Sequence, residues 1–275
     1  RAYASSLRSM QRYLGKKDFP FIKLSSRIIS DYQGKLLASG ICDNTIGFYL
    51  HNIKALFRKG CREMGLELPC PFRDISIKTE KTLKRSLDPV VIKTLSAIEL
   101  EKDSPLSLAR DIFMFSFYTR GMSFVDIALL KKRHVFPGEI CYRRHKTDQL
   151  MRVGINKEIS RILERYKNVP GEYIFPLFPA ERDPYAGYRS AYHRIRYSLG
   201  KISRVIGLEF PLRLHAARHS WATIAKVNGA SVHVIGECLG HTSEKTTRIY
   251  LKELDHSALD AVNNQVADFI LAVDD

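Results

Sequence analysis

Residues 212–219 read Leu-Arg-Leu-His-Ala-Ala-Arg-His, and they give the first indication of the chemistry of this chain. Leu239-Gly240-His241 and then Tyr250 follow them. A tyrosine phenol is a weak nucleophile at neutral pH, so it needs a positively charged pocket for its target and groups that transfer protons. Two histidines and an arginine in these runs can supply both. The set therefore suits attack by a tyrosine on a phosphodiester.

Each of these elements has an ordinary alternative when it is taken alone. His215 and Arg218 lie at a spacing that puts two polar side chains on one helix face. Leu239-Gly240-His241 is also typical of a helix end with the glycine in the left-handed conformation. A single tyrosine such as Tyr250 is usually a half-buried core aromatic. The ordered set at these spacings is much harder to explain in that way.

The ordered set resembles the catalytic motif of the tyrosine recombinases, the phage integrase family of site-specific DNA recombinases. The matching residues are Leu214-His215-Ala216-Ala217-Arg218-His219-Ser220-Trp221-Ala222-Thr223, Gly229, Leu239-Gly240-His241, Thr246-Thr247 and Tyr250. This resemblance implies an enzyme that cuts and rejoins DNA strands through a 3′-phosphotyrosine intermediate and a Holliday junction, in integration, excision or inversion. The sequence around residue 120 is most similar to recombinases of Bacteroides-type mobile elements and invertible loci.

The resemblance also implies the architecture, which is mainly α-helical with a small β-sheet. We expect a helical core DNA-binding domain over residues 1–72 and a mixed α/β catalytic domain over residues 85–275, ending in a protomer-docking helix. Residues 73–84 lack a sustained apolar period and follow Pro69-Cys70-Pro71, which stops a helix. They are expected to form a basic linker, either a simple tether or a segment that crosses a duplex backbone.

Apolar residues recur at helical spacing through both predicted domains. The first domain is expected to hold helices near residues 7–14, 28–40 and 44–65, with Asn44 capping the third. The second is expected to hold helices from Asp88-Pro89 onward and over 106–117, 123–130, 157–166, 186–206 and 218–228. Residues 139–155 indicate two short strands around a polar turn.

Most site residues are carried over from the resemblance, position by position. It implies that Lys146, beside the predicted turn, protonates the departing 5′ oxygen, and a desolvated lysine, unlike arginine, can lose its proton. The planar guanidinium of Arg218 suits two nonbridging phosphate oxygens. His215 is expected to assist proton transfer from Tyr250, and His241 to donate a hydrogen bond to the phosphate.

The first arginine of the family pattern is irregular in this chain. If Asp126 is the acidic member of that pattern, the usual place of the arginine holds Ser123, and Arg120 lies three residues too early. Ser123 and Asp126 also form a capping-box-like pair. We predict that Gly121 lets the turn bring Arg120 to the phosphate, with Arg144 on the predicted hairpin as the alternative.

The charge distribution favours a polyanionic partner, which we expect to be double-stranded DNA recombination sites. The formal net charge is +15 and the isoelectric point is near 9.6. Residues 253–275, in contrast, hold six acidic residues and no Lys or Arg. Their apolar stripe either packs on its own domain or, as the resemblance implies, docks on another protomer in a tetramer on DNA. The resemblance also leaves room for accessory DNA-bending proteins.

The composition gives no indication of a metal, a cofactor or a membrane span. The five cysteines have no Cys-x-x-Cys spacing, which argues against a zinc site and a disulfide framework. A phosphotyrosine conserves the bond energy, so we expect neither metal nor cofactor. The cysteine usage fits a reducing cytoplasm, where we expect the protein to act. No apolar run is long enough to span a bilayer. Arg1 lies in a helical pattern without a preceding Met, so a removed N-terminal piece is expected.

Two other classes of protein fit part of this sequence. A type IB topoisomerase-like enzyme uses the same tyrosine chemistry to relax DNA, and its products are relaxed circles rather than recombined joints. A catalytically silent DNA-binding module would bind without becoming covalently trapped on a nicked duplex. The filled acid and base positions favour the recombinase over this module.

Overall fold

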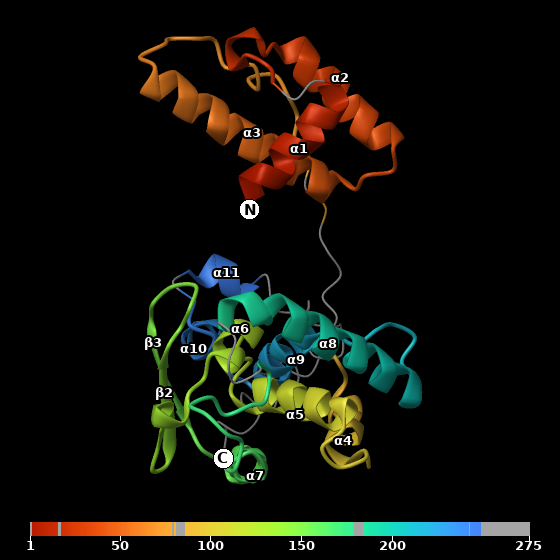
Figure 1. Ribbon diagram of the computed structural model, residues 1–275, viewed down its shortest axis with the longest axis vertical. Helices are drawn as coiled ribbons and strands as arrows, with labels where there is room; N and C mark the ends of the chain where they lie inside the picture. Colours follow the sequence, from red (N-terminus) through yellow and green to blue (C-terminus); the bar gives the residue numbers. More distant parts are fainter. Residues whose placement is uncertain are drawn as a thin grey trace, which may run out of the picture. The chain divides into compact units, whose positions relative to one another are not determined.

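The computed structural model describes residues 2–15, 18–78, 80, 86–178, 184–241 and 243–248. Contacts divide the chain into two compact units, Arg1–Leu83 and Lys84–Asp275 (Figure 1). The expected fold class, mainly α-helical with a small β-sheet, is confirmed. None of the helices within the described ranges is long and apolar enough to cross a membrane.

The first unit consists of helices packed around a small apolar core. Its elements are α1 (Ala2–Leu14), the 3-10 helix η1 (Phe21–Lys23), α2 (Ser26–Ala38) and α3 (Asp43–Glu63). Ile29 and Tyr32 of α2 and Leu50 of α3 are fully buried. The Tyr32 hydroxyl hydrogen bonds to Ser9 Oγ of α1 at 2.7 Å, so its polar end is satisfied inside this core.

The prediction that Asn44 caps the third helix is wrong. The helix begins at Asp43, and Cys42 precedes it without a side-chain cap. The Asn44 amide instead donates to the carbonyl of Glu80 at 3.0 Å and accepts from the Glu80 backbone N–H at 3.1 Å. This pair of bonds holds Glu80, in the segment that follows α3 in the chain, against the start of α3, which local sequence patterns do not reveal.

The second unit is built around one buried helix, α5 (Pro105–Tyr118). Ser104 caps α5 and Pro105 occupies its first turn, and Ile112, Phe113 and Phe115 are fully buried. The other helices are α4 (Pro89–Ala97), α6 (Phe124–Ala128), η2 (Lys132–His134), α7 (Lys157–Arg165), α8 (Pro184–Val205), α9 (Leu214–Val227), α10 (Val232–Cys238) and α11 (Glu244–Arg248). Helices α8 and α9 both pack on α5, which therefore forms the centre of the unit (Figure 1).

A three-stranded antiparallel sheet lies at one edge of the second unit (Figure 1). Its strands are β1 (Val135–Phe136), β2 (Glu139–Arg143) and β3 (Leu150–Gly154). Ile140 pairs with Val153, and both face the core, whereas alternate side chains are more exposed. The predicted pair of strands around a polar turn is confirmed.

Two local predictions about the region of the motif can be compared with the helices. Helix α9 begins at Leu214, four residues before the expected start at Arg218, so both polar residues of the His-x-x-Arg pair lie in its first turns. Gly240 follows α10 with a φ of 64°, which confirms the left-handed helix end. That helix end places His241 directly after a tight turn, so the structural and functional interpretations of this tripeptide are compatible.

Candidate active site

Arg218 is the buried cation at the centre of the candidate site. Its side chain is only 5% exposed, and its two terminal nitrogens donate to the carbonyls of Gly121, at 2.7 Å, and Leu239. Two backbone acceptors fix the plane of the guanidinium, which is the geometry that phosphate recognition needs. Gly121 has a φ of 74°, and a Cβ there would lie 2.5 Å from Arg218 Cγ, so this position requires glycine.

His241 contacts Arg218 on one side and α11 on the other. Its Nε2 lies 3.0 Å from an Arg218 terminal nitrogen, and its Nδ1 lies 3.0 Å from Thr247 Oγ1. Burial lowers the pKa of His241 to about 4, and the positive charges of Arg218, Arg144 and Lys146 act in the same direction. The imidazole is therefore neutral at physiological pH.

Arg144, on the turn between β2 and β3, reaches the same place from the sheet. Its side chain is 9% exposed and donates to the carbonyl of Gly240, the residue before His241. The sheet and the end of α10 are in close contact here, because a Cβ on Gly240 would lie 2.9 Å from Met151 Sδ of β3. The hairpin thus places the buried guanidinium of Arg144 next to the backbone that leads into His241.

Asp126 holds the hairpin turn that carries Lys146. Its Oδ1 accepts the backbone N–H of His145 at 2.8 Å, and its Oδ2 accepts the Ser123 hydroxyl at 2.5 Å. Ser123 also caps α6, as its capping-box spacing predicted. Lys146 itself is exposed, and its charge contributes to the lowered pKa of His241. The turn therefore presents an exposed lysine near the buried arginines.

Arg120 lies at the same end of the unit but has different partners. It adopts a φ of 59° after α5 and donates to the carbonyl of Arg152 on β3 at 3.4 Å. Burial raises the pKa of the Tyr142 phenol, and the positive charges of Arg218, Arg144 and Arg120 oppose that rise. Arg120 is thus near the cationic group, although the charges acting on His241 come from Arg218, Arg144 and Lys146.

His215 is exposed at the start of α9 and borders a small cavity. The cavity has a volume of about 190 Å³, and Ser123, His215 and Arg218 are among the residues that line it. The ring of His215 packs edge-on against His219 with the centroids 4.7 Å apart. One cavity is therefore shared by His215, Arg218 and Ser123, the position at which the family pattern has its first arginine.

Tyr250 and the apolar stripe of residues 259–273 lie outside the described residues. Helix α11 ends at Arg248, two residues before Tyr250, and packs on α10. No group of three or more His, Cys, Asp or Glu side chains in the described part of the chain is arranged to hold a metal ion.

Sequence reasoning missed the parts played by Thr247 and Asp126. In the sequence Thr247 is only one letter of a motif, and its hydroxyl contact with His241 depends on the packing of α11. Asp126 has the spacing of a capping residue, but its second oxygen also binds the hairpin. The signal available for Thr247 was its helical spacing from Tyr250, which favours one shared face of a helix.

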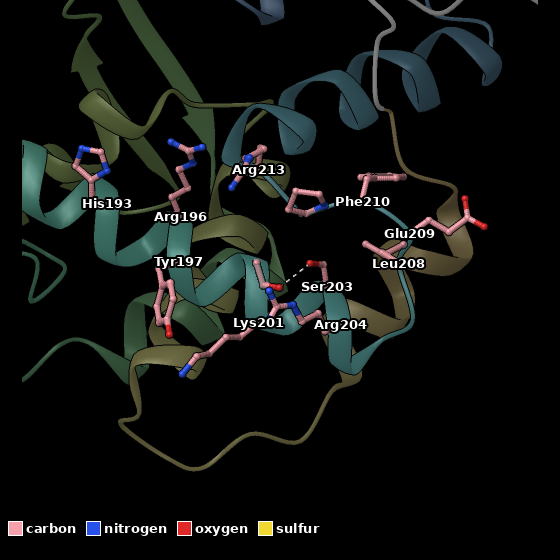
Figure 2. Close-up of a pocket in the computed structure, with 12 residues that line it drawn as sticks. His193, Arg196, Tyr197, Lys201, Ser203, Arg204, Leu208, Glu209, Phe210 and Arg213 are labelled. Atoms are coloured by element: carbon pink, nitrogen blue, oxygen red, sulfur yellow. Dashed lines mark hydrogen bonds between the residues drawn. The ribbon is translucent and has the colours of Figure 1, made fainter.

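A basic groove is formed by the C-terminal half of α8 and the segment that leads from it into α9 (Figure 2). It has a volume of about 690 Å³, and its basic lining residues are His193, Arg196, Lys201, Arg204 and Arg213. Tyr197 is 67% exposed, and the Lys201 ammonium lies 4.8 Å from its ring centre. Glu209 is the acidic residue among those that line the groove.

Comparison with known families matches both units. The model of the phage integrase family matches residues 86–256, and that of the phage integrase SAM-like domain matches residues 1–73. The tyrosine recombinase XerC of Shewanella oneidensis is 26% identical over 226 residues, covering 78% of this chain and 70% of that protein. The tyrosine recombinase XerD of Pseudomonas putida is 36% identical over 94 residues, covering 32% and 30%.

Solved structures share the fold. A lambda integrase dimer bound to a COC′ core site has a TM-score of 0.69 at 17% identity, covering 92% of this chain and 89% of that one. The XerH site-specific recombinase bound to palindromic difH has a TM-score of 0.69 at 18% identity, covering 90% and 74%. These similarities extend over both units of the chain.

The fold and the family matches together define a DNA strand-breaking and strand-joining enzyme. Because the family model spans more than half of the sequence, the chain belongs to the phage integrase family, the tyrosine recombinases. It is a site-specific recombinase, as the sequence motif predicted. The topoisomerase-like and silent DNA-binding alternatives are not favoured.

Proposed function

We propose that Tyr250 attacks the scissile phosphorus of a DNA strand, forming a Tyr–O–P bond as the bond to the 5′ oxygen breaks. His215 takes the phenolic proton, and Lys146 supplies the proton that the departing 5′ oxygen needs. Arg218 and His241 bind the nonbridging oxygens of the phosphate as negative charge develops. The 5′ hydroxyl of a second strand then attacks the 3′-phosphotyrosine, and the P–O bond to Tyr250 breaks as the phenol regains its proton. Two such exchanges, one for each pair of strands, proceed through a Holliday junction.

One observation carries this proposal, namely that cations from separate elements converge on His241. Arg218 comes from α9, and Arg144 and Lys146 come from the hairpin turn, and all three charges disfavour the protonated imidazole. Such a cluster of cations is costly without an anion and becomes stabilising when one binds. A phosphodiester is an anion of suitable size and charge for this place.

We further propose that Arg144, rather than Arg120, fills the role of the first arginine. Arg144 is buried and oriented by the Gly240 carbonyl next to His241. Arg120 instead forms a long 3.4 Å bond to strand β3. A guanidinium that is already desolvated and held in place costs less to organise around the transition state.

Single-turnover cleavage of a nicked suicide substrate tests this assignment. We expect Arg144→Ala to lower the cleavage rate by about a hundredfold or more, the usual cost of removing one preorganised donor. Arg120→Ala should be much milder, and Tyr250→Phe should bind DNA but form no covalent product. Near-normal cleavage by Arg144→Ala with a crippled Arg120→Ala would reverse the assignment. A covalent band that survives denaturation in Tyr250→Phe would refute the nucleophile.

We also propose that the basic groove on α8 contacts the phosphates of the bound DNA. Three of its cations, Arg196, Lys201 and Arg204, come from α8 and line the same groove. Each phosphate contact that is removed should reduce the slope of log affinity against log salt by about 0.9. Lys201→Ala and Arg204→Ala should each show such a reduction. The control Arg161→Ala, on the exposed face of α7, should leave the slope unchanged.

The charge of the C-terminal residues also bears on how protomers assemble on DNA. We propose that recombination takes place in a tetramer on two DNA sites in the cytoplasm, with residues 253–275 joining neighbouring protomers. Their acidic character suits a protein surface better than a phosphate backbone. Residues 1–72 and the catalytic domain would both contact the core site, as the two parts of a clamp, and residues 73–84 would link the two. Accessory DNA-bending proteins are a further class of partner.

A further inference from the structure

Thr247 is a buried hydroxyl residue behind the candidate active site. It lies on α11 with no exposed surface, and its Oγ1 is 3.0 Å from His241 Nδ1. Gly236 of α10 makes room for it, because a Cβ at that glycine would lie 2.8 Å from the Thr247 hydroxyl. The packing of α11 on α10 thus brings a single donor-acceptor group to the rear of the imidazole.

The contacts of His241 determine which of its nitrogens carries the proton. An arginine side chain only donates hydrogen bonds, so His241 Nε2 must accept from Arg218 at 3.0 Å. Because the imidazole is neutral, the proton is on Nδ1, and Nδ1–H donates to Thr247 Oγ1. The ring is therefore in its Nδ1–H tautomer, with Nε2 acting as an acceptor.

Assistance to the phosphate requires the other neutral tautomer of His241, with the proton on Nε2. A phosphate oxygen only accepts hydrogen bonds, so His241 can assist it only if Nε2 carries a proton. Full protonation of the ring is opposed by burial and by the charges that face it, which are Arg218 on α9 and Arg144 and Lys146 on the hairpin turn. Moving the proton from Nδ1 to Nε2 through water needs no net gain of charge.

We propose that Thr247 is a positioning residue for strand cleavage, because its hydroxyl supports His241 in either neutral tautomer. Without DNA it accepts a hydrogen bond from Nδ1–H. When the scissile phosphate replaces Arg218 as the partner of Nε2, the hydroxyl rotates and donates to Nδ1, which leaves Nε2–H directed at the phosphate. This inference rests on the proposed function and goes beyond it, since a hydroxyl is both donor and acceptor whereas a methyl group is neither.

Cleavage rates of matched variants give the first test. Thr247→Val keeps the shape but removes the hydroxyl, and single-turnover cleavage should fall about tenfold, the rate equivalent of one neutral hydrogen bond. Thr247→Ser restores the hydroxyl and should recover most of that loss. Thr246→Val, at the exposed neighbouring position, should cleave at the normal rate. Equal rates for Thr247→Val and Thr246→Val would overturn the proposal.

A second variant displaces the Thr247 hydroxyl without a substitution at Thr247. Gly236→Ala suits a helix, but its Cβ would push the Thr247 hydroxyl away from His241. It should therefore slow cleavage, and the same close contact should lower the melting temperature of the protein modestly. Normal cleavage by Gly236→Ala would count against the proposal even if Thr247→Val failed to fold.

The nitrogen-15 spectrum of the His241 ring reports its tautomer, which a purely structural role of Thr247 would leave unchanged. The full chain labelled at histidine should show Nδ1–H without DNA, and Tyr250→Phe bound to a nicked duplex should show Nε2–H. Adding Thr247→Val to that complex should lessen the Nε2–H signal. One unchanged tautomer in free and bound protein would overturn the proposal. Absence of any covalent product from the unaltered protein would instead overturn the proposed function, and the free-protein spectrum separates the two failures.

Discussion

Replacing Gly121 with alanine should test how tightly the loop after α5 is built onto Arg218. The new Cβ would lie 2.5 Å from Arg218 Cγ and 2.8 Å from its Cα, so relief requires a shift of helix α9 itself. The left-handed backbone at this glycine adds about 1 kcal/mol for any L side chain, and forced overpacking typically adds about 1–3 kcal/mol. We therefore expect Gly121→Ala to lower the free energy of unfolding by about 2–4 kcal/mol.

Thermal unfolding of the full chain measures this effect. At about 2–4 °C per kcal/mol for a domain of this size, Gly121→Ala should lower the melting temperature by roughly 5–15 °C. Gly138→Ala is a matched control, because Gly138 has a φ of 84° but no heavy atom of the described residues lies within 4 Å of where its Cβ would stand. It should lose only about 1 kcal/mol, the backbone part alone. Equal losses for the two variants would refute the close-contact reasoning.

Three further predictions concern His241, the acidic tail and the helical unit. The pKa of His241 is about 4 in the folded protein and 6.5 ordinarily, so the neutral imidazole contributes stability above pH 6.5 that is lost as the pH falls toward 4. The urea midpoint of His241→Asn should therefore change less between pH 6.5 and pH 4 than that of the unaltered protein. Deleting residues 257–275 should impair synaptic complex formation more than suicide-substrate cleavage; equal loss of both, with lower thermal stability, would favour a tail packed in cis. Isolated residues 85–275 should bind the DNA site more weakly than the full chain, and equal binding at all salt concentrations would contradict a two-unit clamp.

The parts of the site that the sequence predicted are those fixed by short-range spacing. His215 and Arg218 share the first turns of α9, and His241 follows a left-handed glycine, because helix periodicity and glycine chemistry act within a few residues. The capping pair Ser123 and Asp126 was recognised for the same reason. Local rules were sufficient wherever both partners lay on one element.

The parts that escaped depend on contacts between distant segments. Whether Arg120 or Arg144 approaches His241 depends on how the β2–β3 hairpin packs against the end of α10, which no spacing within either segment encodes. The bond of Asn44 to Glu80 competes with its capping propensity and prevails through tertiary packing. Thr247 was not recognised because its contact with His241, only six residues earlier, depends on how α11 folds back onto α10.

The two carbonyl acceptors of Arg218 bear on how the enzyme matures. They belong to Gly121 and Leu239, which lie 97 residues before and 21 residues after it in the chain. A growing polypeptide that has emerged only as far as α9 therefore holds an arginine with half of its scaffold. The guanidinium of Arg218 therefore gains its second acceptor only after α10 and the turn that follows it have been synthesised and have packed against α9.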